Sequence, residues 1–142
     1  MSEKLSVQEN FREHLAQLRE TLLQLHKALV ESERHSYEQS IGKIASPGHF
    51  LQLLTTDPWF AWLHPVSELI VAIDEAVDAK KKQPLTREGA EVLLKQIRSL
   101  LTASETGEGF ARHYFEALER DPDVLFAHAA VMKLFHPRKP AA

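Results

Sequence analysis

Apolar residues recur at helical spacing in every long segment of the chain. The clearest series advances by alternate steps of four and three residues, through Phe11, Leu15, Leu18, Leu22, Leu25 and Leu29. Because an α-helix completes a turn in about 3.6 residues, this spacing brings the series onto one face of a helix. We call Leu15, Leu18, Leu22, Leu25 and Leu29 the leucine seam, and it predicts a long helix over about residues 5–40.

Proline divides much of the remaining chain into short segments. Between residues 41 and 135, four prolines follow a small polar residue or a histidine, in the pairs Ser46-Pro47, Asp57-Pro58, His64-Pro65 and Asp121-Pro122. Ser and Asp cap helix N-termini, and proline at the first helical position forfeits no intrahelical hydrogen bond. With Thr86 as a further cap, the apolar spacing predicts helices over about residues 47–54, 58–63, 65–82, 86–103, 108–120 and 122–135.

These elements together predict the fold class. Only five glycines occur, and no stretch alternates apolar and polar residues as a half-buried strand would. Long amphipathic helices with short connections prefer to pack antiparallel around one core. We therefore predict a single all-α domain over residues 1–142, an antiparallel helical bundle of about four long helices with short end-capping helices. Residues 136–142, which include two prolines, are expected to form a loose tail.

The helix predicted over residues 122–135 differs from the others. Its sequence, PDVLFAHAAVMKLF, is apolar nearly all round instead of along one stripe. A helix of this kind is usually surrounded by the rest of the protein. We expect it to be the most buried helix of the fold.

Composition narrows the classes of function. The 142 residues include no cysteine, which excludes disulfides, thiol nucleophiles and cysteine-ligated metals. Seventeen basic and twenty acidic side chains give a net charge of −3, whereas a nucleic-acid-binding domain usually carries a basic excess. No apolar run has the length of a membrane span, and no signal peptide is recognisable. We expect a cytoplasmic protein without nucleic-acid or membrane partners, and we assign Lys80, Lys81 and Lys82 to a solvated helix end.

Motifs for catalysis and metal binding are missing from the sequence. None of the eight histidines has an acidic residue three positions before it, and no His-x-x-x-His pair occurs. The chain also lacks a Gly-x-Ser-x-Gly elbow and a complete phosphate-binding glycine loop. The sequence therefore predicts no catalytic residue, no metal and no cofactor, and it favours a protein that is not an enzyme.

One histidine, His128, lies inside the apolar segment 122–135. A buried imidazole needs a hydrogen-bond partner or a ligand, since leaving it unpaired costs about 1–3 kcal/mol. One interpretation is a core histidine bonded to a carbonyl or a carboxylate. The other is a ligand-binding histidine that faces another helix, with the candidate partners His113, Tyr114 and Asp74.

A cluster of large apolar residues occupies the short segment 58–63. Its members are Trp59, Phe60, Trp62 and Leu63. They cannot all face the same way, so some either plug the end of the bundle or remain exposed, and an exposed aromatic pair would mark a partner surface. We therefore favour a non-catalytic protein-interaction or regulatory module that uses this cluster to bind a protein partner or a second copy as a homodimer. The alternative is a helical bundle with an internal metal, haem or small-molecule site at His128.

Overall fold

The computed structural model describes residues 2–78 and 85–135, with side chains from residue 10 onward within those ranges. Its elements are α1 (Ser2–Ser40), α2 (Pro47–Thr56), the 3₁₀ helix η1 (Pro58–Leu63), α3 (His64–Val77), α4 (Arg87–Leu100), α5 (Phe110–Arg120) and α6 (Pro122–Phe135). These residues include no strand, which confirms the all-α class. None of these helices combines the length and the apolar character that crossing a bilayer requires.

Four of the predicted helix starts are confirmed by capping hydrogen bonds, whereas α5 begins at Phe110, two residues later than predicted, and has no side-chain cap. Side-chain oxygens of Ser46, Asp57, Thr86 and Asp121 accept hydrogen bonds of 2.8–3.1 Å from backbone amides two or three residues further on. These contacts satisfy amides that have no partner within the helix itself. The chain passes directly from η1 into α3, so His64 begins α3 although it precedes a proline.

Two helices end earlier than the apolar pattern predicts. α3 stops at Val77, where Asp78 has an extended backbone, and α4 stops at Leu100. The apolar stripe of α3 is complete at Val77, whereas Leu101, the residue directly after α4, is still buried in the core. The lysines at 80–82 and the expected tail at 136–142 lie outside the described residues.

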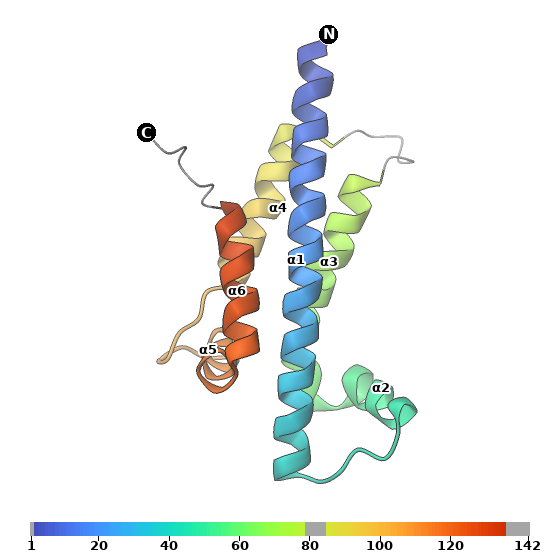
Figure 1. Ribbon diagram of the computed structural model, residues 1–142, viewed down its shortest axis with the longest axis vertical. Helices are drawn as coiled ribbons and strands as arrows, with labels where there is room; N and C mark the ends of the chain where they lie inside the picture. Colours follow the sequence, from blue (N-terminus) through green and yellow to red (C-terminus); the bar gives the residue numbers. More distant parts are fainter. Residues whose placement is uncertain (1, 79–84, 136–142) are drawn as a thin grey trace.

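α1 occupies the middle of the arrangement. It packs against α3 on one side and α6 on the other, and it also contacts α4, which packs against α3 (Figure 1). The chain runs in alternating directions along α1, α3, α4 and α6 (Figure 1). η1 lies against α1 near the end where α1 finishes, with α2 and α5 both in contact with it.

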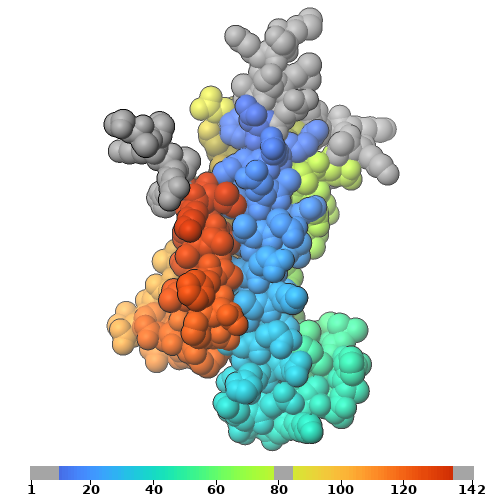
Figure 2. All heavy atoms as spheres, in the orientation of Figure 1, coloured from blue at the N-terminus to red at the C-terminus, as the bar shows by residue number. Residues whose placement is uncertain are grey.

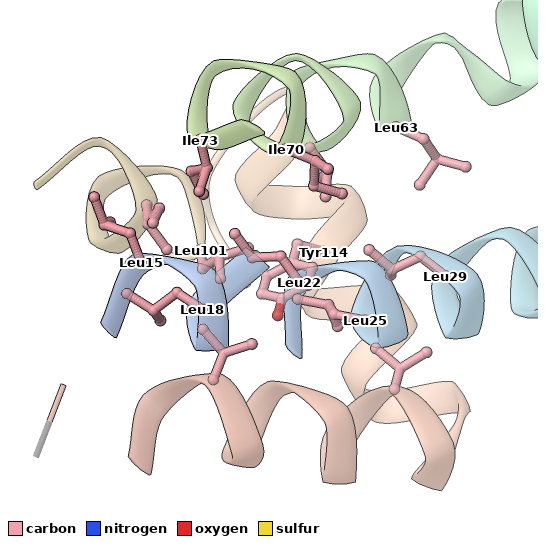
Figure 3. Packing of buried hydrophobic residues seen from close by; sticks show 14 of the residues in the cluster. Leu15, Leu18, Leu22, Leu25, Leu29, Leu63, Ile70, Ile73, Leu101 and Tyr114 are labelled. Atoms are coloured by element: carbon pink, nitrogen blue, oxygen red, sulfur yellow. The ribbon is translucent and has the colours of Figure 1, made fainter. Parts of the chain in front are cut away.

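The core is built around the leucine seam of α1. All five leucines of the seam have no solvent exposure. Figure 3 shows them between Ile70 and Ile73 of α3, Leu101 at the end of α4, and Tyr114 of α5. α3, α4, α5 and α6 therefore bury apolar side chains around the leucine seam, which makes the seam the centre of the core.

Beside this core, polar contacts join α5 to α1. Ser32 and Glu33 are buried near the C-terminal half of α1. Arg120, in the last turn of α5, donates to the Glu33 carboxylate at 2.8 Å and to the Ser32 hydroxyl at 3.0 Å. Because Glu33 is buried, the guanidinium partner is needed to offset its loss of hydration.

The expectation that residues 122–135 form the most buried helix is wrong. Only Val124 and Val131 of α6 are buried, whereas α1 buries its entire leucine seam. The reason is the number of neighbours, because α6 packs on α1 and α5 through one face only. Its opposite face is apolar and exposed, with Leu125 at 50% and Phe126 at 72%.

The seam can be tested with two adjacent leucines of α1. Leu22 is fully buried and Leu23 is 41% exposed. We expect Leu22→Ala to lower the free energy of unfolding by about 2–5 kcal/mol, because it opens a cavity in the core. Leu23→Ala is expected to change it by less than about 1 kcal/mol. Urea denaturation followed by circular dichroism measures both, and equal losses would contradict the assigned core.

Candidate functional site

The four apolar residues of η1 mostly serve the core. Phe60 and Leu63 are 0% and 2% exposed, so these two residues follow the first of the two alternatives that the sequence left open, burial at the end of the fold. A 3₁₀ helix has about three residues per turn, which puts positions 60 and 63 on the same inward face. They plug the end of the fold, where Phe60 contacts the rings of Tyr37 and Phe50.

The two tryptophans of η1 are half-buried and are engaged by neighbouring rings. Trp59 lies edge-on to Tyr37, with 5.6 Å between the ring centroids. Trp62 stacks on His113 at 5.3 Å and lies edge-on to Phe110. Both indole nitrogens are buried, and neither has a hydrogen-bond partner among the described residues. The tryptophans therefore join η1 to α1 and α5 instead of forming a free aromatic pair.

The structure brings two of the predicted ligand-binding residues together. The hydroxyl of Tyr114 lies 2.6 Å from Nδ1 of His128, in a hydrogen bond between α5 and α6. Tyr114 is fully buried, and burial raises its pKa above the ordinary value of a phenol. Burial also lowers the pKa of His128. Both groups are therefore neutral at pH 7, and in the Nε2–H tautomer of His128 the hydroxyl donates to Nδ1.

The other two predicted ligand-binding residues lie elsewhere. His113 is exposed and stacks on Trp62. Asp74 accepts a hydrogen bond from Arg19 at 2.7 Å, in an exposed ion pair between α3 and α1. The part of the chain that the structure describes holds no group of three or more His, Asp or Glu arranged to bind a metal. His128 and Tyr114 thus form a hydrogen-bonded pair between two helices.

A hollow of about 360 Å³, lined by both charged and apolar residues, lies between the end of α1 and the start of α2. Its charged groups already pair with one another: the Arg34 guanidinium lies 3.5 Å from Glu38 and 3.7 Å from Glu31. The second oxygen of Glu38 accepts a hydrogen bond from the amide of Ile44, and this bond lowers the pKa of Glu38. These contacts hold the loop that follows α1, and this structural role accounts for the charged groups of the hollow.

Among the described side chains, two large exposed apolar residues are adjacent in the sequence on α6 alone. We define the outer face of α6 as Leu125, Phe126, Ala129 and Ala130, all of which are exposed. The spacing of these residues places them on one side of the helix, opposite Val124 and Val131. In Figure 2 the upper part of α6 forms an edge of the molecule, bordered by α1. The exposed charges Lys133 and Asp123 lie on and beside this face.

Sequence reasoning missed this surface although its signal was present. The all-round apolar character of segment 122–135 was interpreted as burial on every side. The same pattern fits a helix that is covered on one face by its own chain and carries a second apolar face outward. Whether such a helix is buried on all sides or on one face depends on how many helices pack against it. The periodicity of a single segment carries no information about that number.

Comparisons with known proteins supply no relative of this chain. No protein family matches it, and no curated protein or solved structure shows significant similarity to it. The functional argument therefore starts from the contacts, the burial and the charges described above.

The hydrogen bond between α5 and α6 can be tested with the two tyrosines of the chain. We expect Tyr114→Phe to lower the free energy of unfolding by about 1–2 kcal/mol, because Nδ1 of His128 loses its partner. Tyr37→Phe is the matched control, since Tyr37 packs through its ring against Trp59 and Phe60. Its expected change is below about 0.5 kcal/mol. Urea unfolding measures both, and no loss in Tyr114→Phe would contradict the pair.

Proposed function

We propose that this chain is a non-catalytic protein-interaction module that binds a protein partner through the outer face of α6. The observation that carries the proposal is the exposure of Leu125 and Phe126 side by side, at 50% and 72%. Removing such side chains from water contributes about 25 cal/mol for each Å² of apolar surface, so covering this face favours association. Contiguous apolar surface of this kind marks interaction sites on folded proteins.

The neighbouring alanines and charges define the partner that this face fits. Ala129 and Ala130 have short side chains, which allow a partner helix to approach the α6 backbone closely. Lys133 lies on the same side of α6 and favours an acidic group opposite it, and Asp123 favours a basic group at the other end. The partner is therefore an apolar helix face with one charge of each sign near its ends.

The proposed function is the one that the sequence favours, but the proposed binding surface lies on α6 instead of η1. η1 is a weaker candidate, because Phe60 and Leu63 are buried and both tryptophans already contact other rings. A partner that bound η1 would have to displace these contacts. A partner that binds α6 displaces none, since Phe126 is exposed in the folded chain. Binding there leaves the core unchanged, which is the usual situation for preformed interfaces.

Phe126→Ser tests the surface, with Leu51→Ser as the matched control. Leu51 is on α2 and is 63% exposed, so both substitutions remove one exposed apolar side chain. We expect both variants to unfold within about 1 kcal/mol of the wild type. In quantitative pull-downs with tagged protein, the partner bound by the wild type and by Leu51→Ser should bind Phe126→Ser at least about tenfold more weakly.

The purified partner is then titrated against all three proteins by calorimetry. A partner that binds Phe126→Ser as tightly as the wild type would overturn the proposed surface. A wild-type chain that binds neither another protein nor an untagged copy of itself would also overturn the proposed surface.

A further inference from the structure

We infer that the partner of the outer face of α6 is a second copy of this chain, with the two α6 helices packed antiparallel about a twofold axis. The inference rests on the proposed function, since it names the occupant of the same face. Homodimers of this symmetry use one patch twice, so the patch must complement itself. The outer face of α6 does so in both shape and charge.

The shape complementarity comes from large and small residues placed symmetrically about position 128. In an antiparallel pair centred there, residue 126 of one copy lies level with residue 130 of the other. The exposed ring of Phe126 then packs over Ala130 and Ala129 of the second copy, and the reverse contact repeats across the axis. A large side chain set against two small ones is the arrangement that lets helices interdigitate closely.

The charge complementarity follows from the same register. Asp123 and Lys133 are each five residues from position 128, which is about 7.5 Å along a helix that rises about 1.5 Å per residue. Pairing the helices antiparallel therefore brings Asp123 of each copy level with Lys133 of the other. A parallel pair would instead align like charges. The opposed helix dipoles also favour the antiparallel arrangement.

Other segments of this chain are poor occupants of the face. The sequences of the two undescribed segments after residue 78, Ala-Lys-Lys-Lys-Gln-Pro at 79–84 and His-Pro-Arg-Lys-Pro-Ala-Ala at 136–142, contain no large apolar side chain. Among the side chains that the structure describes, the remaining large apolar residues with substantial exposure lie singly on other segments, and they are Leu23, Ile41, Leu51, Val71 and Val92. A second α6 offers the matching combination of apolar stripe and paired charges.

The expected dimer is weak and reversible. α6 has 14 residues, so one pair of these helices buries less surface than a standard stable interface. We expect a dissociation constant on the order of tens of micromolar. Self-association should therefore appear as a rise in mean mass with protein concentration.

A charge-reversal mixing experiment tests the antiparallel register. Asp123→Lys and Lys133→Asp are prepared separately, and each homodimer then places like charges together at both ends of the interface. We expect each variant to dimerise about tenfold more weakly than the wild type. In the heterodimer of an equimolar mixture, one contact joins the two substituted positions and the other joins the unchanged Asp123 and Lys133. Both contacts then pair opposite charges, so association should return to about the wild-type level.

Sedimentation equilibrium measures the four samples, and thermal unfolding at low concentration shows whether each variant is folded. Glu68→Lys and Lys95→Asp, on α3 and α4, are substitutions of exposed residues that make the same charge changes on helices that do not pack against α6. This control pair should dimerise as the wild type does, both alone and mixed.

Each outcome decides the inference. Weak homodimers that regain affinity on mixing support it. A wild-type chain that stays monomeric up to about 1 mM would overturn it, as would a dimer insensitive to both reversals or not restored by mixing. If the chain is monomeric but another protein binds it in a Phe126-dependent way, the proposed function stands and self-association alone fails. If no protein binds through Phe126, both fail.

Discussion

Burial of the leucine seam of α1 is the interaction on which the rest of the structure depends. Its five leucines are fully buried, and α3, α4, α5 and α6 all place apolar side chains around them. Without disulfides, the fold relies on this one continuous core. The polar contacts of the interior follow from it, because the pairs Tyr114–His128 and Arg120–Glu33 satisfy groups that packing around α1 takes out of water.

The geometry of the seam also explains the exposed face of α6. One helix packs against α1 through one side of its surface, so α6 covers Val124 and Val131 and leaves the opposite side in solvent. For an ordinary amphipathic helix that side would be polar, as it is on α4 and α5. On α6 it carries Leu125, Phe126 and two alanines, and the fold itself offers no reason for this composition. The partner that we propose for this face would account for it.

Much of the fold could be predicted from the sequence, because its signals are local. The spacing of Leu15 to Leu29 identified α1 and its buried face, and the caps Ser46, Asp57 and Asp121 identified three helix starts. Tyr114, one of the partners predicted for His128, lies on the preceding helix and donates to it across a tight corner. The burial of Phe60 and the exposure of Phe126 were not accessible in this way, since both depend on which helices lie alongside.

The central claim is that this chain binds a second copy of itself through the outer face of α6 and not through η1. Amide chemical shifts in two-dimensional ¹H–¹⁵N spectra, recorded from about 20 μM to about 1 mM protein, test it most directly. The account predicts concentration-dependent shifts that cluster in residues 122–133 and vanish in Phe126→Ser. Spectra that do not change with concentration, or changes that cluster in residues 58–63, would contradict it.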